Sequence, residues 1–239
     1  MTRIADPIPF LYEELDVQHT ELGELVLRRR CSAGFGGKVV YEVTIDGEFL
    51  MSSHVNDAEI ALARLGLASF DREIDVMVGG LGLGHTAASA LDLPNVRSLT
   101  VVELLAPVIG WHKDNLVPLG TQLLTDVRCR IVQRDFFDYV TQPGDGATWD
   151  AILLDIDHSP EFLLHPRNRA FYEGDGPRSL TAILATDGVF ALWSADPPGE
   201  DFLDNLRTAF ADVTTHEIQF AVPQLDCDDT NVIVVARRD

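Results

Sequence analysis

The chain has few basic residues for its size. Only 18 Lys and Arg stand against 38 Asp and Glu in 239 residues, which gives a formal net charge of −20. Nucleic-acid binding depends on clustered Lys and Arg that neutralise phosphates, so this charge argues against a nucleic-acid partner. The same charge suits a small cationic substrate, and it also favours solubility without any functional meaning. Charge alone leaves both interpretations open.

Cysteine is scarce as well. Cys31, Cys129 and Cys227 are odd in number and widely spaced, which excludes a disulfide framework or a zinc motif and indicates a reducing compartment. The N-terminus has no signal-peptide pattern, and no apolar run is long enough to span a bilayer. We therefore expect a cytoplasmic protein without a membrane partner. No metal-ligand spacing and no Gly-x-Ser-x-Gly elbow occurs, so we predict neither a metal site nor serine hydrolysis.

The most informative stretch is residues 75–86, DVMVGGLGLGHT. An apolar run passes into Gly80, Gly82 and Gly84, and a helical pattern follows, which predicts a buried strand, a tight turn and a helix N-terminus. Glycine suits such a turn because it accepts positive φ and has no Cβ to block a ligand. The N–H groups at a helix N-terminus attract the polar or anionic part of a nucleotide-like ligand. We assign these glycines, with His85 beside them, to cofactor binding.

A small β unit is expected before this stretch, over residues 1–55. Residues 1–22 indicate an irregular lead-in, whereas residues 24–53 are β-rich. Asp46-Gly47 lies between apolar runs, which is a strong hairpin signal. Asn56-Asp57 can cap a helix over about residues 58–68. The rest of the chain, residues 56–239, is expected to form the catalytic domain.

Strand and helix patterns alternate along this second part. Short apolar strands are predicted at 74–79, 98–103, 128–133, 149–155 and 189–194, and helices at 84–91, 105–115, 168–184 and about 200–210. Two final β runs, 213–222 and 231–237, leave no room for a crossover helix, so they should be antiparallel. The fold class predicted is therefore α/β: a class I methyltransferase-type, Rossmann-like sheet that is mostly parallel and ends in an antiparallel hairpin.

Acidic residues follow three of the predicted strands. In an open parallel sheet the ligand lies beyond the carboxyl ends of the strands. Glu103 stands where a carboxylate can accept both hydroxyls of a ribose, and Asp135 can accept from an adenine amino group while Phe136 covers the ring. Asp155 and Asp157 share one side if their strand continues. Together with the glycine turn, these residues predict a nucleoside-binding site.

These segments resemble the spermidine synthase (polyamine aminopropyltransferase) family, within the wider S-adenosylmethionine-dependent transferase fold. The resemblance covers residues 24–195 and includes YEVTIDGEFLMSS, VMVGGLGLGHTAASAL, LTVVELLAPVIGWHKDNL, VRCRIVQRDFFDYV, WDAILLDIDHSP and AFYEGDGPRSLTAILATDGVFALW. It implies that Glu103 holds the ribose, that Asp135 holds the adenine amine and that Asp155 is the catalytic base. Asp157 or His158 would lie near the incoming amine. It also implies a homodimer and decarboxylated S-adenosylmethionine as co-substrate.

The chain departs from the family pattern at several positions. The family's glycine loop reads G-G-G-D-G-G, and Gly82 stands where its aspartate would hold the amino group of the aminopropyl arm. The family's D-S-T-D-P becomes DIDHSP, with His158 at or next to the second aspartate. The family's Tyr-His-Glu is not visible on the helix before the first core strand, which offers Glu59 and Arg64 instead. A glutamine expected near the hairpin is replaced within residues 50–54.

Three functions remain open from the sequence. The first is aminopropyl transfer from decarboxylated S-adenosylmethionine to an amine such as a polyamine, which the segment order favours. The second is methyl transfer from intact S-adenosylmethionine to an amine or another small nucleophile, which the missing loop aspartate favours. The third is a non-catalytic nucleoside-binding protein, and the retained acids at 155 and 157 count against it. In the two transferase readings, an alkylamine of pKa about 10 must lose a proton before it attacks, and a carboxylate can accept that proton.

Overall fold

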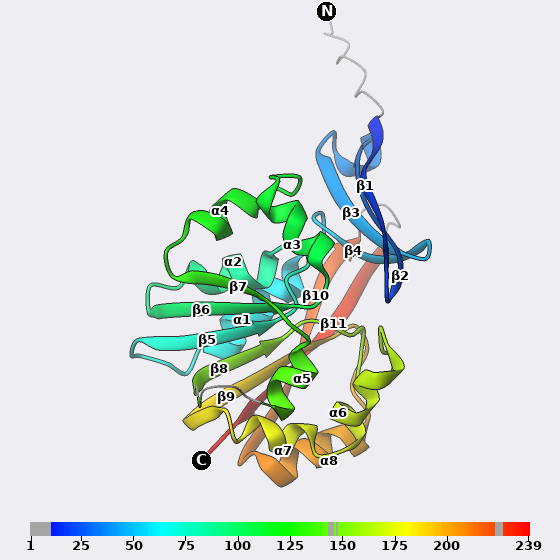
Figure 1. Cartoon of the computed structure of the whole chain (residues 1–239). Helices are drawn as coiled ribbons and strands as arrows, with labels where there is room; N and C mark the ends of the chain where they lie inside the picture. Colours follow the sequence, from blue (N-terminus) through cyan, green and yellow to red (C-terminus); the bar gives the residue numbers. More distant parts are fainter. Residues whose placement is uncertain (1–10, 143–145, 147, 223–226) are drawn as a thin grey trace, which may run out of the picture. The chain divides into compact units, whose positions relative to one another are not determined.

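The computed structural model describes residues 11–142, 146, 148–222 and 227–239. The chain divides into two compact units. Unit 1 comprises Met1–Asn56 and Phe220–Asp229, and unit 2 comprises Asp57–Gln219 and Thr230–Asp239. Figure 1 labels the helices and strands.

Unit 1 contains a four-stranded antiparallel sheet in the order β1-β2-β3-β4. Its strands are β1 (Leu11–Thr20), β2 (Gly23–Cys31), β3 (Val39–Ile45) and β4 (Glu48–Ser52), and a short 3-10 helix, η1 (Ala33–Phe35), joins β2 to β3. Asp46 and Gly47 have φ values of 49° and 82°, as the predicted two-residue hairpin turn requires. The hairpin prediction is confirmed.

One prediction for unit 1 was wrong. Residues 11–20 form strand β1 and not an irregular lead-in, and residues 1–10 of that prediction lie outside the described residues. This strand lies at the edge of its sheet, and most of its side chains are exposed or only half-buried. An edge strand with little buried surface does not need apolar alternation, so its sequence carries no clear period of two.

Unit 2 is built on a seven-stranded sheet in the order β10-β11-β9-β8-β5-β6-β7 (Figure 1). The strands are β5 (Ile74–Gly79), β6 (Val96–Glu103), β7 (Cys129–Gln133), β8 (Trp149–Leu154), β9 (Leu184–Ser194), β10 (Asp212–Val222) and β11 (Cys227–Arg237). Strands β5 to β9 pair in parallel, and β11 runs antiparallel to β9. The predicted α/β class, with a mostly parallel sheet and a C-terminal hairpin, is confirmed.

Helices cover both faces of this sheet. They are α1 (Asp57–Leu67), α2 (His85–Leu91), α3 (Ala106–Lys113), α4 (Gly120–Thr125), α5 (Phe136–Thr141), α6 (Arg169–Glu173), α7 (Gly176–Leu180) and α8 (Glu200–Ala209), with a 3-10 helix η2 (Pro166–Asn168). Side chains of α5 to α8 pack with Ile152 and Leu154 in one apolar cluster. Gly66 of α1 lies against Leu153 instead. Because successive strand residues face opposite ways, α1 covers the other face.

Two helix predictions need correction. The single helix expected over 168–184 is three short pieces, η2, α6 and α7, and strand β9 already begins at Leu184. Gly174 ends α6, and Pro177 lies in the first turn of α7, which breaks the pattern. Helices α4 and α5 were not predicted, because six residues give too little periodicity to recognise.

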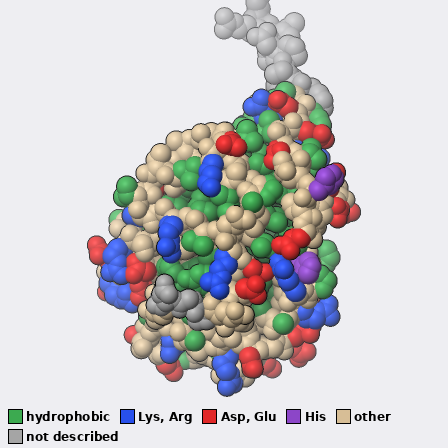
Figure 2. All heavy atoms as spheres, in the orientation of Figure 1, with side chains coloured by type: hydrophobic (Ala, Val, Ile, Leu, Met, Phe, Trp, Pro, Cys, Tyr) green, Lys and Arg blue, Asp and Glu red, His purple; other side chains and the backbone are tan. Residues whose placement is uncertain are grey.

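Basic side chains on the surface are few and often lie beside acidic ones. Several arginines are paired with acids, including Arg97 with Asp75 and Arg128 with Asp126. On the face shown in Figure 2, Lys and Arg side chains are scattered, and many lie next to acidic ones. None of the described helices combines the length and the apolar composition that a bilayer-spanning helix needs.

The close approach of α3 and α4 gives a test of the packing. A Cβ at Gly120 would lie 2.5 Å from the carbonyl oxygen of His112, which is backbone and cannot rotate away. We expect Gly120→Ala to lower the free energy of unfolding by about 1–3 kcal/mol. Gly110, in α3, has open space around it, so Gly110→Ala should be neutral or stabilise by up to about 1 kcal/mol. Urea unfolding of both variants checks this, and equal stabilities would contradict the packing described.

Candidate active site

The glycine loop joins β5 to α2 in the predicted way. Gly80, Gly82 and Gly84 have φ values of 95°, 47° and 93°, all in the left-handed region that favours glycine. Between them, the side chains of Leu81 and Leu83 are buried and anchor the loop to the interior. The loop therefore presents backbone at the carboxyl edge of the sheet.

Glu103 holds this loop in place from the end of β6. Its side chain is only 8% exposed and accepts hydrogen bonds from the backbone N–H of Leu81 (2.9 Å) and of Leu105 (2.7 Å). Burial raises the pKa of this carboxyl, and the backbone hydrogen bonds oppose that rise. The structure thus places Glu103 next to the glycines. The role predicted for it from the sequence is to bind the ribose hydroxyls.

Two histidines lie behind the loop. His85 is the first residue of α2, and burial, followed by the charge of His112, lowers its pKa. His112 is fully buried on α3, with its Nε2 atom 2.9 Å from the carbonyl oxygen of Gly82. Sequence reasoning gave His112 no role in the site, because nothing in the sequence signals a contact with a residue 30 positions away.

Asp135 and Phe136 follow β7 and begin α5. Asp135 caps the helix by accepting from the N–H of Phe137 (2.8 Å), and it also pairs with Arg167 at 3.0 Å. Phe136 is 1% exposed, and its ring lies against Gly79 in the core. The structure therefore leaves Asp135 at the strand edge, while the Phe136 ring packs inward and presents no exposed face to a ligand.

Asp155 stands directly after β8, beside the glycine loop. The Thr86 hydroxyl of α2 donates a 2.6 Å hydrogen bond to its carboxylate. Burial raises the pKa of Asp155 to about 6, against the lowering effect of the Thr86 hydrogen bond. An acid with this pKa is mostly ionised at neutral pH and can still accept and release a proton there.

Glu59, in the first turn of α1, lies within electrostatic range of Asp155. Burial raises the pKa of Glu59 to about 8, and the negative charge of Asp155 adds to the rise. The sequence showed Glu59 on this helix but gave it no role, because an acid in a first helical turn is ordinary.

Asp157 has a different environment from Asp155. The strand ends at Leu154, so the alternation that was to bring Asp155 and Asp157 to one side does not apply. Asp157 is 1% exposed and accepts hydrogen bonds from the Leu164 N–H (2.7 Å), the Asn168 amide (2.9 Å) and the Tyr172 hydroxyl (3.0 Å). Its oxygens are engaged in shaping the loop over residues 158–168.

His158 is half-buried at the start of that loop. Its ring centroid lies 5.1 Å from that of Phe162, and burial lowers its pKa against the raising effect of Asp157 and Asp196. The sequence placed this histidine near an incoming amine. The structure places it next to Asp157 in the chain, with its ring against Phe162.

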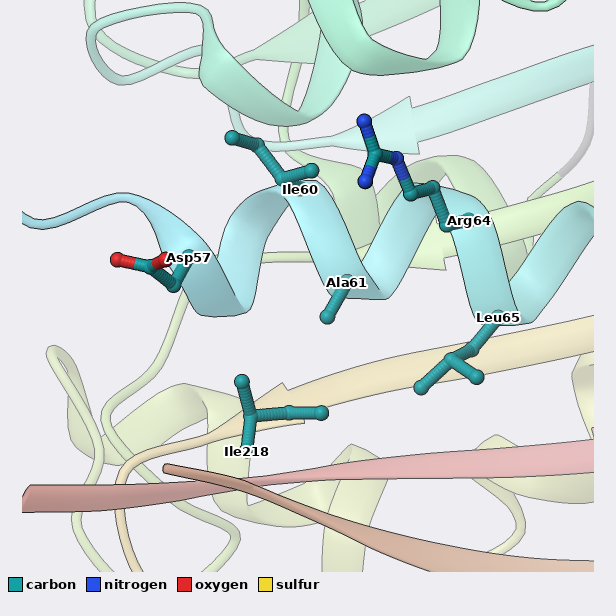
Figure 3. Close-up of a pocket in the computed structure, with 6 residues that line it drawn as sticks. All are labelled: Asp57, Ile60, Ala61, Arg64, Leu65 and Ile218. Carbon is teal, nitrogen blue, oxygen red and sulfur yellow. The ribbon is translucent and has the colours of Figure 1, made fainter. Parts of the chain in front are cut away.

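A separate groove lies along α1. Its volume is about 360 Å³, and it is lined by Asp57, Ile60, Ala61, Arg64, Leu65 and Ile218. Figure 3 shows Ala61 and Leu65 pointing toward Ile218 of β10. The groove includes none of the predicted site residues, so we do not count it as part of the site. Within the described residues, no group of three or more His, Cys, Asp or Glu could hold a metal ion.

The glycine loop and the acids along the carboxyl edge of this sheet belong to a Rossmann-like fold of the class I methyltransferase type. Residues 59–225 match the family model described as the spermine/spermidine synthase domain, and the chain belongs to that family. It is 27% identical over 136 residues to a polyamine aminopropyltransferase of Prochlorococcus marinus, covering 57% of this chain and 46% of that protein. It is also 27% identical over 135 residues to one of Sulfolobus acidocaldarius, covering 55% and 42%.

Solved structures show the same fold. The spermidine synthase of Thermotoga maritima superposes with a TM-score of 0.74 at 17% identity, covering 95% of this chain and 73% of that one. A spermidine synthase in complex with the transition state analogue AdoDATO gives a TM-score of 0.74 at 17% identity, covering 95% and 74%. The chain spans about half the length of the curated relatives it matches, 46% and 42%.

The contacts of Asp157 predict a structural effect. In Asp157→Asn, the new amide nitrogen would face neighbouring donors and one hydrogen-bond acceptor would be lost. We expect the free energy of unfolding to fall by about 1–3 kcal/mol. Asp155→Asn, which keeps an oxygen for the single Thr86 hydroxyl, should change stability much less. Urea unfolding compares the two, and an Asp157→Asn variant as stable as the parent would show that these contacts matter little.

Proposed function

We propose that this protein transfers an aminopropyl group from decarboxylated S-adenosylmethionine to an amine such as a polyamine. The observation that carries the proposal is Asp155, a half-buried carboxyl with a pKa of about 6 beside the glycine loop at the carboxyl edge of the sheet. Membership of the spermine/spermidine synthase family supports it, as do relatives named polyamine aminopropyltransferase. The high content of acidic residues is consistent with a cationic acceptor.

The reaction needs a deprotonated amine next to a sulfonium carbon. The amine nitrogen forms a bond to the aminopropyl carbon, the carbon–sulfur bond breaks, and the electron pair stays on the neutral thioether that leaves. An alkylamine is mostly protonated at neutral pH, so one proton must go to a base, and we assign that role to Asp155. Holding both reactants in line supplies much of the rate.

The nucleoside would lie along the neighbouring strand ends. In this proposal Glu103 accepts from the ribose hydroxyls, and Gly80, Gly82 and Gly84 allow close approach of the loop backbone, with His85 at the start of the following helix. Asp135 accepts from the adenine amino group and shares its carboxylate with Arg167, which lies 3.0 Å away. No metal takes part in the proposed step.

Methyl transfer from intact S-adenosylmethionine is the second candidate. It is favoured by Gly82, which leaves the loop without a carboxylate for the amino group of the aminopropyl arm. The two activities share every proposed nucleoside contact and differ only at that arm.

We propose further that residues 1–55 and 56–239 are separate domains, and that the protein is a cytoplasmic homodimer. A division between compact units after Asn56 supports the domain boundary, although residues 220–229 group with the first unit. The dimer rests on the family resemblance, and the location rests on the cysteine content.

Calorimetry with S-adenosylmethionine and its decarboxylated form, side by side, tests the function directly. We expect tighter binding of the decarboxylated form, followed by turnover with polyamine acceptors. Tighter binding of the intact form would replace aminopropyl transfer with methyl transfer. Failure of both to bind at millimolar concentration would reject the nucleoside site, and binding without turnover on any amine would indicate a non-catalytic protein.

Asp155→Asn should separate chemistry from binding. We expect turnover to fall by about 10²–10⁴-fold, because the base is lost, while nucleoside affinity stays within about twofold. In the parent protein the carboxyl is protonated below its pKa of about 6, so kcat/KM should fall as pH decreases through that value. The variant should lack this step. A parent profile without a step near pH 6, or a large loss of nucleoside affinity in Asp155→Asn, would remove Asp155 as the base.

A further inference from the structure

The first turn of α1 lies over the end of β8. Gly66 of this helix lies against Leu153, and Glu59 is seven residues earlier, about 10 Å along the helix axis. Asp155 is two residues beyond Leu153, about 7 Å along the strand direction. This places Glu59 and Asp155 at the same end of β8, within electrostatic range of each other.

Helix α2 brings the same groups together from another side. The Ser89 hydroxyl lies 3.5 Å from the carbonyl oxygen of Ile60, the residue after Glu59. Thr86, one turn earlier on α2, donates its 2.6 Å hydrogen bond to Asp155. Residues three apart on a helix share a face, so one face of α2 contacts both α1 and Asp155. Helix α2 therefore contacts both Asp155 and the backbone of α1 next to Glu59.

The charges around this position are acidic. Those that act on Glu59 come from Asp155 at the end of β8 and from Asp57 on its own helix, and Asp155 in turn faces the neutral hydroxyl of Thr86. Glu59 and Asp155 are both half-buried, so neither is sealed from a ligand. A second carboxylate held next to a buried one is unfavourable without a cation, and an ammonium group placed between them would relieve the repulsion.

We propose that Glu59 is the second carboxylate of the amine site and that it binds the acceptor ammonium together with Asp155. This assignment rests on the proposed function. Glu59 takes the role near the amine that was predicted for Asp157. The oxygens of Asp157 instead accept hydrogen bonds from Leu164, Asn168 and Tyr172. Glu59 holds and orients the acceptor nitrogen, while Asp155 takes its proton as the nitrogen–carbon bond forms and the carbon–sulfur bond breaks.

The test compares three variants in α1 with putrescine as the probe. Glu59→Gln keeps nearly the same shape but can no longer ionise when the ammonium binds, so the KM for putrescine should rise by about 10- to 100-fold, the value of one charged hydrogen bond. Its nucleoside Kd should stay within about twofold. Glu59→Asp keeps a carboxylate and should recover part of the loss. The matched control, Asp57→Asn, removes an exposed charge from the same helical turn and should leave the KM within about twofold.

The outcomes separate this assignment from the proposed function. If the parent transfers an aminopropyl group and Glu59→Gln keeps the parent KM, the Glu59 assignment is overturned and the function stands. A loss equal in Glu59→Gln and Asp57→Asn would also overturn it, because net charge would explain the effect. If the parent transfers nothing, calorimetric binding of putrescine decides. Binding by the parent but not by Glu59→Gln supports the assignment without the function, and equal binding or none by both overturns it.

Discussion

The close passage of the glycine loop over the backbone of Asp155 is the constraint on which the site depends. A Cβ at Gly80 would overlap the Asp155 carbonyl oxygen, so only glycine lets β5 end this near to β8. Asp155 in turn donates its backbone N–H to the carbonyl of Gly79 at 2.9 Å. Glu103 fixes the next residue of the loop through the Leu81 N–H. The adjacent strand ends therefore hold the loop and the proposed base in one rigid arrangement, which a positioned reaction requires.

Buried and half-buried carboxyl groups in this protein have contrasting environments. Glu42, in unit 1, is paired with Arg28 and Arg30, and Glu103 is held by backbone N–H groups. Glu59 and Asp155, both half-buried, interact electrostatically with each other instead, and burial raises the pKa of each. A structure built only for stability gains nothing from such an arrangement, because an unpaired buried charge is costly. A site that receives a cation does gain, since the ligand supplies the missing positive charge at the moment of binding.

The loop over residues 158–168 has contacts at both of its ends, with Asp157 and with Asp135. Asp157 ties the beginning of this segment to Asn168 and to Tyr172 of α6. Arg167, near its end, pairs with Asp135 after β7. The loop thus contacts both α6, which follows it, and Asp135, the residue proposed to bind the adenine amino group. A nucleoside bound to Asp135 as proposed would also meet the Arg167 guanidinium.

Local patterns in the sequence determined the fold class, the hairpin at Asp46-Gly47, the glycine turn and the placement of Glu103 and Asp155 after their strands. These features depend on backbone preference and on the period of apolar residues, which neighbours in the chain reveal. Tertiary structure alone decided that Asp157 turns inward and that the Phe136 ring packs on Gly79. It also decided that His112 contacts Gly82 and that Glu59 lies within electrostatic range of Asp155. Those outcomes depend on where a strand stops and which helix lies over it, and such contacts join residues far apart in the chain, beyond the reach of any local pattern.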